Sequence, residues 1–276
     1  MSAAIEALPP LREVIAQHEL AARKSLGQNF LLDLNLTRKI ARAAMPWTDV
    51  ASVIEIGPGP GGLTRALLLE GAPKVTAVER DERCLGALAD LVQAAGGRLA
   101  LHPGDAVETD FAALAPAPWQ VVANLPYNIA TPLILGWVAQ VQNFTRITVL
   151  VQKEVAERLA AKPGGKTYGR LAVAAQWRCE VRMLFDIGPK AFVPPPKVTS
   201  TLVELQPRAK PLAEADPSKL ERVTAAAFNQ RRKMLRAALK SLWPDADAKL
   251  EQAGIDPTRR AETLSIEEFC ALARLL

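Results

Sequence analysis

Short apolar runs alternate with stretches of helical periodicity between Ser52 and Val151. This alternation predicts β-α-β units, in which helices connect the parallel strands of one sheet. Two further runs, Cys179 to Phe185 and Thr199 to Leu205, have no comparable helix between them and predict an antiparallel hairpin with a long connection. We therefore expect an α/β fold with a mainly parallel sheet. The parallel strands are predicted at Val53 to Ile56, Val75 to Val78, Leu99 to Leu101, Val121 to Ala123 and Ile147 to Val151.

The pattern changes after Leu205. Residues 206 to 218 are rich in proline, alanine and charged residues, a composition typical of a linker. Beyond this segment, apolar residues recur only at helical spacing. Ser265 and Glu268 also have the spacing of a capping box, which starts a helix. Helices are predicted at Leu220 to Phe228, Lys233 to Leu242, Ala246 to Ala253 and Ser265 to Leu275.

The length of the chain predicts one large domain with a small appendage. Single hydrophobic cores stop growing near about 250 to 300 residues, and this chain has 276. We place a large α/β domain at residues 1–206, with an N-terminal helical segment at 1–45. A small all-helical domain is expected at residues 207–276.

The composition argues against membrane, secreted and metal-binding proteins. No segment approaches the roughly 20 apolar residues of a membrane span, and the start of the chain lacks the order of a secretory signal. We expect a soluble cytoplasmic protein with no membrane partner. The three cysteines, Cys84, Cys179 and Cys270, are far apart, and His18 and His102 are the only histidines. We expect buried thiols and no metal, and the net charge of +5 permits binding to a polyanion.

A glycine-rich loop follows the first predicted strand. Gly57, Gly59 and Gly62 fit the G-x-G-x-x-G spacing, which lets a ligand approach the backbone closely. A dinucleotide-binding domain has the same strand, loop and helix, so an NAD-dependent oxidoreductase is an alternative. Pro58 and Pro60 fill the loop, however, whereas a dinucleotide loop must offer amides to a pyrophosphate. The loop therefore favours a nucleoside ligand without phosphate.

Acidic residues end the next two strands. Glu79 follows Gly57 by about 22 residues, where a carboxylate can accept hydrogen bonds from both ribose hydroxyls. Asp105 ends the third strand at the height where a carboxylate can bind an adenine amine. Together with the glycine loop, these strand ends predict a nucleoside site at the carboxyl edge of the sheet.

The tetrapeptide Asn124-Leu125-Pro126-Tyr127 follows the fourth strand and carries the most chemistry. Transfer of a methyl group to adenine N6 is difficult because the nitrogen lone pair is delocalised into the ring. The Asn124 side-chain oxygen and the Leu125 carbonyl can accept from the two N–H bonds and favour a pyramidal nitrogen. Tyr127 offers a face on which an extruded base can stack. The tetrapeptide predicts methyl transfer to an exocyclic amine, without a strong general base.

Six segments are similar to the ribosomal RNA adenine N6-dimethyltransferase family, over nearly the whole chain, and most of all to the bacterial enzymes that act on small-subunit (16S) rRNA. They are Ser25 to Leu31, Glu55 to Gly61, Asn124 to Tyr127, Gln152 to Ala156, Phe192 to Ser200 and Phe228 to Lys233. The resemblance implies a Rossmann-like, S-adenosylmethionine-dependent methyltransferase domain followed by the helical domain. It also implies dimethylation of two adjacent adenosines near the 3′ end of the rRNA, with a role in ribosome biogenesis.

By the same resemblance, the methyl donor is S-adenosylmethionine, the product is S-adenosylhomocysteine, and the partner of a monomeric enzyme is the small ribosomal subunit with its rRNA. Asn124, Leu125 and Tyr127 are expected to hold the base, and Phe192 to close the pocket from the other side. From the residues alone, Phe192 fits equally well as a core side chain on a proline-stiffened loop. The expected cofactor contacts are Gln28, Asn29, Leu31, Gly57, Gly59, Glu79, Asp105, Ala106 and Asn124.

Basic residues predict the RNA contacts. The segment from Arg231 to Lys240 contains few acids and can hold phosphates without selecting a sequence. Arg23 and Lys24 are further candidates near the predicted cofactor site. The basic segment could instead be only a solvated helix face. For the protein as a whole, two alternatives stay open: a large-subunit rRNA adenine methyltransferase and a non-catalytic assembly factor. The predicted RNA-binding residues are Arg231, Arg232, Lys233 and Arg236.

Overall fold

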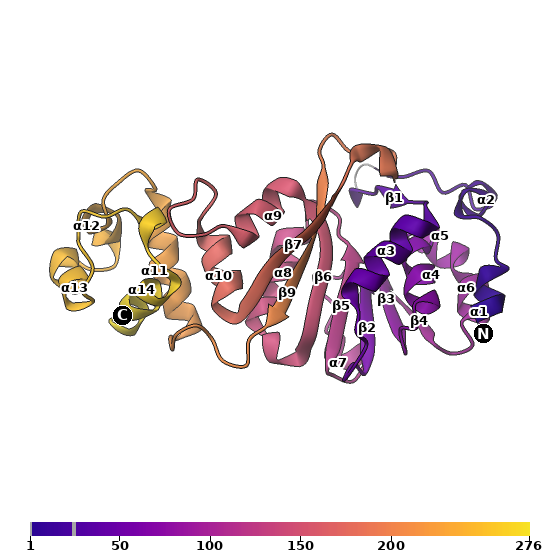
Figure 1. The fold of residues 1–276 in the computed structure, drawn as a ribbon, viewed down its shortest axis with the longest axis horizontal. Coiled ribbons are helices and arrows are strands. Elements are labelled where there is room, and N and C mark those ends of the chain that lie inside the picture. Colours follow the sequence, from indigo (N-terminus) through magenta and orange to yellow (C-terminus); the bar gives the residue numbers. More distant parts are fainter. Residues whose placement is uncertain (1, 24–25) are drawn as a thin grey trace. The chain divides into compact units, whose positions relative to one another are not determined.

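The computed structural model describes residues 2–23 and 26–276, and its main feature is a seven-stranded sheet with the strand order β4-β3-β2-β5-β6-β9-β7 (Figure 1). The pairs β2–β3, β3–β4, β2–β5 and β5–β6 are parallel, as predicted, and β9 is antiparallel to β6. The strands are β2 (Ser52–Ile56), β3 (Val75–Glu79), β4 (Leu99–Pro103), β5 (Trp119–Asn124), β6 (Phe144–Gln152), β7 (Cys179–Ile187) and β9 (Ser200–Pro207).

The predicted hairpin is present as the neighbours β7 and β9, and β9 is the strand that pairs with β6. A second, two-stranded sheet was not predicted. It joins β1 (Phe30–Leu31) to β8 (Phe192–Val193) in antiparallel register, with Leu31 opposite Phe192. Two-residue strands are too short to show a period of two, so periodicity cannot reveal them. This small sheet ties the N-terminal segment to the proline-containing loop before β9.

Helices α3 and α4, in the N-terminal part of the chain, lie against the parallel sheet (Figure 1). In α3, Asp33 caps the first turn by accepting hydrogen bonds from the backbone amides of Asn35 and Leu36. The core combines Ile40 of α3 and Leu67 of α4 with strand residues, because a parallel sheet must be buried on both faces. The helices are α1 (Ser2–Glu6), α2 (Leu11–Gln17), α3 (Leu34–Ala44), α4 (Gly62–Leu69), α5 (Glu82–Ala87), α6 (Ala89–Ala94), α7 (Phe111–Leu114), α8 (Ala130–Ala139) and α9 (Lys153–Ala160).

The chain divides into two compact units, 1–156 with 182–206, and 157–181 with 207–276. Residues 157–181, which we expected in the first domain, thus belong to the second unit. The reason is packing: Val173 and Trp177 of α10 lie in one buried cluster with Val223 and Phe269 of the C-terminal helices. The second unit contains α10 (Arg170–Arg178), α11 (Pro217–Asn229), α12 (Leu235–Ala238), α13 (Ala246–Gln252) and α14 (Ile266–Arg274).

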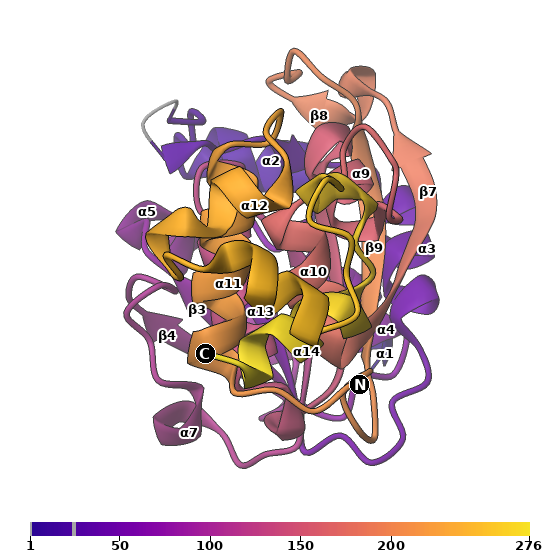
Figure 2. The same cartoon turned by 90° about the vertical axis from the view of Figure 1, so that its left-hand side faces the viewer.

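Figure 2 shows the helices of the second unit. The predicted capping box at Ser265 is confirmed, with both of its hydrogen bonds to Glu268 present. The predicted helix from Lys233 begins later, at Leu235, and its end tightens into the 3-10 turn Leu239–Ser241. Further 3-10 turns among the described residues include Val141–Asn143, Pro189–Ala191 and Ala261–Thr263.

Two expectations from composition can be compared with the fold. Cys84, Cys179 and Cys270 are buried and form no disulfide, as predicted. Burial raises the pKa of the Cys84 thiol to about 12, so this group stays protonated at neutral pH. No helix in residues 2–23 or 26–276 has the length and apolar character needed to cross a membrane.

Candidate active site

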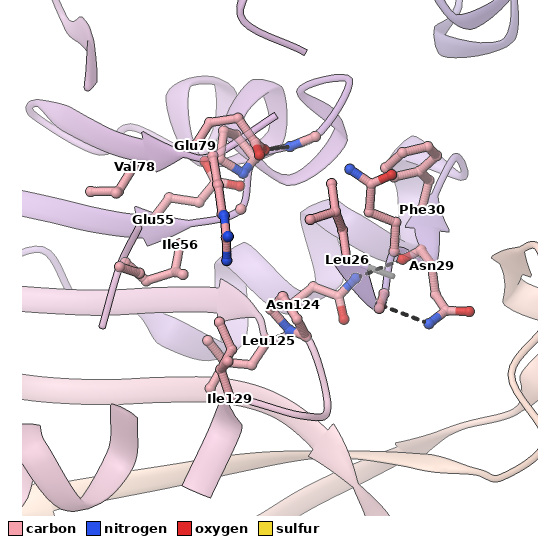
Figure 3. A pocket seen from close by; sticks show the side chains of 18 of the residues that line it. Leu26, Asn29, Phe30, Glu55, Ile56, Val78, Glu79, Asn124, Leu125 and Ile129 are labelled. Atoms are coloured by element: carbon pink, nitrogen blue, oxygen red, sulfur yellow. Dashed lines mark hydrogen bonds between the residues drawn. The ribbon is translucent and has the colours of Figure 1, made fainter. Parts of the chain in front are cut away.

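A pocket lies at the carboxyl edge of the parallel sheet, within the first unit (Figure 3). Its walls come from the loops after β2, β3, β4 and β5 and from the N-terminal segment around β1. Its lining combines apolar side chains with a few polar ones, as in most small-molecule sites. The lining residues are Leu26 to Leu31, Glu55 to Pro60, Gly62, Leu63, Val78 to Arg80, Gly104 to Ala106 and Asn124 to Ile129.

The glycine loop after β2 packs directly against the N-terminal segment. A Cβ atom on Gly62 would lie 2.5 Å from the backbone oxygen of Leu31, closer than any side chain permits. A Cβ atom on Gly59, which has a φ of +54°, would lie 3.0 Å from the Phe30 ring. These glycines therefore allow the N-terminal segment to form one wall of the pocket.

Glu79 is held in one orientation at the end of β3. One carboxylate oxygen accepts from the Gly59 amide at 3.0 Å and the other from the Asp81 amide at 2.8 Å. Burial raises the pKa of Glu79, and the backbone hydrogen bonds oppose the shift. Each oxygen keeps a further lone pair, so the fixed carboxylate can accept hydrogen bonds from a diol.

Glu55 also lines the pocket, and its side chain is 1% exposed. Its Oε2 atom has no hydrogen-bond partner among the residues that the structure describes. Burial raises the pKa of Glu55 to about 8, and nearby Glu79 contributes to the rise. A buried acceptor without a partner is costly, so this position suits a donor or cation on a ligand. The motif from Glu55 to Gly61 contains this residue, but the sequence pattern alone indicates no role for its side chain.

Asn124, at the end of β5, has a fixed amide orientation. Its Nδ2 donates to the backbone oxygen of Asn29 at 3.0 Å, a contact drawn as a dashed line in Figure 3. A carbonyl oxygen only accepts, so the NH₂ side must face Asn29 and Oδ1 must point the other way. Asn29 is itself positioned, because its Nδ2 donates to the oxygen of Gly27 at 3.2 Å. The N-terminal segment thus presents Asn124 as a hydrogen-bond acceptor.

Leu125 and Tyr127, the other two residues predicted to hold the base, also line the pocket. The Leu125 amide donates to the oxygen of Leu150 at 3.1 Å and so continues the ladder between β5 and β6. Tyr127 is half-buried, and its hydroxyl lies 2.8 Å from the Oγ of Ser200. Ser200 could not be singled out from the sequence, because a serine at the start of a strand carries no distinctive pattern.

Phe192 is not brought to this pocket. It is 2% exposed and lies in the hydrophobic core together with Leu31, the residue opposite it in the β1–β8 pair. The residues that follow β8 are prolines, but the Phe192 ring is part of the hydrophobic core. Among the two interpretations of Phe192 from sequence, the geometry favours the core side chain.

Gln28 and Asp105 line the pocket but have intramolecular partners. The Gln28 amide donates to Asp81 at 2.9 Å and accepts from the Arg23 amide at 2.8 Å. The side-chain hydrogen bond from Arg83 is the main reason why the pKa of Asp81 falls to about 2, so Asp81 stays charged. Gln28 therefore fastens the N-terminal segment to the loop after β3.

Asp105 forms an ion pair with the exposed Arg80 at 2.9 Å, and its other oxygen accepts from the Val107 amide at 3.0 Å. Ala106 lies next to it in the pocket wall and is buried. The ion pair is exposed and therefore weak, so a ligand amine can replace Arg80. Among the described residues, no group of three or more His, Cys, Asp or Glu side chains is placed to hold a metal ion.

The predicted RNA-binding residues divide into two kinds. Arg231 bonds within the second unit: Nε contacts Glu262 at 2.9 Å, and one terminal nitrogen donates to the oxygen of Lys166 at 2.5 Å. It therefore braces the fold. Arg232, Lys233 and Arg236 are exposed. In the first unit Arg23 is exposed, whereas Lys24 and Ser25 lie outside the described residues.

Comparison with known proteins shows which family the chain belongs to. Residues 19–276 match the model of the family described as ribosomal RNA adenine dimethylase. A protein of Rhodospirillum rubrum named ribosomal RNA small subunit methyltransferase A is 61% identical over 98% of this chain and 93% of its own length. One of the same name from Paramagnetospirillum magneticum is 60% identical over 98% and 95%.

Two solved structures share the fold and part of the sequence. A dimethyladenosine transferase from Plasmodium falciparum is 27% identical, with a TM-score of 0.75 over 87% of this chain and 94% of that one. The 23S rRNA methyltransferase ErmE is 26% identical, with a TM-score of 0.69 over 89% and 98%. This chain belongs to the ribosomal RNA adenine dimethylase family.

Proposed function

We propose that this protein transfers methyl groups from S-adenosylmethionine to N6 of two adjacent adenosines near the 3′ end of small-subunit rRNA. The observation that carries the proposal is the fixed amide of Asn124, whose Oδ1 is turned away from Asn29 and is available as an acceptor in the pocket. The names and high identity of the bacterial relatives support the small subunit as the substrate.

The pocket fits the proposed donor. Glu79 is held by two backbone amides where it can accept from ribose hydroxyls, and the proline-filled loop at Pro58 and Pro60 suits a ligand without phosphate. The unpartnered oxygen of Glu55 suits the amino group or the positive charge of the methionine part. When bound, S-adenosylmethionine supplies a methyl group on a positively charged sulfonium, which is a strong electrophile.

The protein's part in the reaction is orientation. Asn124 Oδ1 and the Leu125 carbonyl each accept one N–H of the adenine amine, which favours a pyramidal nitrogen with its lone pair directed at the donor. Tyr127 supplies an aromatic face for the unstacked base. The proton leaves the nitrogen after transfer, so the site works without a strong base. We propose that Phe192 supports this site from the hydrophobic core, where it holds β8 opposite Leu31 of β1.

For RNA binding we propose Arg232, Lys233 and Arg236, which are exposed on the second unit, with Arg23 near the pocket. Their contacts would hold phosphates, while target choice would rest on RNA shape and unstacked bases. Arg231 contributes by holding its neighbours in place. We further propose that the enzyme acts as a monomer in the cytoplasm, on the small ribosomal subunit, and takes part in ribosome biogenesis.

The alternatives fit less well. The large-subunit enzyme ErmE is 26% identical to this chain, whereas the relative from Rhodospirillum rubrum, named for the small subunit, is 61% identical. A nicotinamide enzyme leaves the arrangement of Asn124 and Tyr127 without a purpose. A non-catalytic assembly factor has no need for an amide fixed in this orientation, although a checking role can accompany catalysis.

The test is transfer of labelled methyl groups into small subunits that lack the modification, followed by nucleoside mass spectrometry. We expect dimethyladenosine with the wild-type protein and at least a hundredfold less with Asn124→Ala, as for the loss of one group that polarises a reaction centre. Asn143→Ala, in a turn before β6, is the matched control and should act like wild type. Turnover by Asn124→Ala at the wild-type rate would remove the proposed role.

A further inference from the structure

We propose that Ser200 is a positioning residue for the methyl transfer, because it holds the Tyr127 ring in the orientation that receives the target base. This inference rests on the proposed function and names a residue to which we had given no role. Ser200 does not line the pocket, so it acts through the tyrosine alone.

The geometry joins three neighbouring strands. Tyr127 lies in the loop after β5, and Ser200 is the first residue of β9. Between them ends β6, whose last residue, Gln152, is the partner of Ser200 in the antiparallel pair. The 2.8 Å contact between the two hydroxyls therefore crosses the end of β6. The contact fixes the hydroxyl end of the Tyr127 ring to β9, which lies two positions from β5 in the sheet.

Ser200 is a firm anchor, because the residues on both sides of it are bonded. The Thr201 hydroxyl donates to Asp186 at 2.7 Å, and the other oxygen of Asp186 contacts the Lys153 ammonium at 2.6 Å. The Lys153 amide also donates to the oxygen of Thr199 at 3.0 Å. Ser200 itself is 0% exposed. Its hydroxyl has little freedom to find water, so the bond to Tyr127 is its main use.

The anchor matters because a stacking platform works best when it is rigid before the base arrives. A tyrosine ring turns about two side-chain bonds, and the backbone of the loop fixes neither of them. The hydroxyl contact restrains both, so the base meets a preorganised face. Without it, the ring samples other orientations and the productive alignment of N6 with Asn124 becomes less frequent.

The experiment uses Ser200→Ala, Tyr127→Phe and the double variant in the full-length protein. We expect each single variant to lower the single-turnover rate at saturating small subunits by about tenfold, the effect of one hydrogen bond. The double variant should be no slower than either single one, because all three lose the same contact. The dissociation constant of S-adenosylhomocysteine, measured by calorimetry, should not change.

Ser52→Ala is the matched control. Ser52 is also a fully buried serine at a strand start, and its hydroxyl lies 3.0 Å from that of Thr76. It starts β2 at the opposite, amino edge of the sheet. The variant should lose stability as Ser200→Ala does but keep the wild-type transfer rate, which separates positioning from a general effect of a buried hydroxyl.

A second measurement does not depend on activity. The chain has two tyrosines, Tyr127 and Tyr168, so labelling the ring carbon that carries the hydroxyl gives two NMR signals, which Tyr127→Phe assigns. Ser200→Ala should shift the Tyr127 signal and leave that of Tyr168, which is buried in the second unit.

Several outcomes would overturn the inference: a wild-type rate in Tyr127→Phe or Ser200→Ala, losses that add in the double variant, or an unshifted Tyr127 signal. If Ser200→Ala does not fold, Tyr127→Phe alone decides. Failure of the proposed function is a different result, since the wild-type protein would then leave the small-subunit adenosines unmodified while the NMR shift could still be present.

Discussion

Replacing Gly62 by alanine should damage the pocket through its N-terminal wall. The new Cβ atom would lie 2.5 Å from the Leu31 oxygen and 3.0 Å from a Leu11 methyl group. A carbon and an oxygen approach to about 3.3 Å at best, so Leu31 must move by about 0.8 Å. Leu31 is paired with Phe192 and packed in the core, and this movement is therefore resisted on two sides.

Such overpacking typically costs about 1–3 kcal/mol, and we expect Gly62→Ala to lower the free energy of unfolding by that amount. The displaced segment also carries Asn29, so affinity for S-adenosylhomocysteine should fall together with stability. Denaturant unfolding and calorimetry measure the two effects.

The matched control is Gly86→Ala in α5, where nothing lies within 4 Å of the added Cβ atom. Because alanine is the better helix former, this variant should gain about 0.5–1 kcal/mol. If Gly62→Ala were as stable as Gly86→Ala and bound S-adenosylhomocysteine normally, the close packing of the N-terminal segment on the glycine loop would be refuted.

Three further predictions concern Glu55, Glu79 and the basic segment. Burial raises the pKa of Glu55 from 4.5 to about 8, so between these pH values the folded protein binds one proton more than the unfolded chain, and its stability should fall as the pH rises from about 5 to 8. In urea unfolding, the stability of Glu55→Gln should depend less on pH than that of the wild type, and an identical pH dependence would contradict the raised pKa. Glu79→Gln should weaken S-adenosylhomocysteine binding at least tenfold, because only one of the two terminal atoms of an amide accepts hydrogen bonds, whereas both carboxylate oxygens do. An unchanged affinity in calorimetry would exclude Glu79 from the binding site. Arg231→Ala should lower the melting temperature, because it removes the contacts to Glu262 and Lys166. Arg232→Ala should leave the melting temperature unchanged but weaken rRNA binding and reduce the salt dependence of that binding. Equal melting temperatures of the two variants would contradict a structural role that is specific to Arg231.

The parallel strands were predictable because buried strands are short apolar runs and their polar ends mark the edge of the sheet. Glu79 and Asn124 illustrate this, since each is the last residue of its strand. Their meeting in one pocket follows from parallel topology alone. The chemistry of the Asn124 tetrapeptide could likewise be inferred from its side chains.

Other features depend on contacts that periodicity does not contain. The helix α10 has an apolar face, but nothing in its pattern says that this face packs with the C-terminal helices. The β1–β8 pair is too short to show alternation. Whether an acid, amide or arginine is free to meet a ligand depends on its neighbours in space, so sequence could not show that Gln28 binds Asp81 or that Arg231 binds Glu262.

A crystal structure of the protein with S-adenosylhomocysteine and adenosine tests the role of Asn124 most directly. We expect the adenine N6 to lie within about 3 Å of both Asn124 Oδ1 and the Leu125 carbonyl oxygen. Asn124 Nδ2 should still donate to the Asn29 oxygen, and the base should stack on Tyr127. A base bound elsewhere, or N6 facing the NH₂ side of Asn124, would contradict this role.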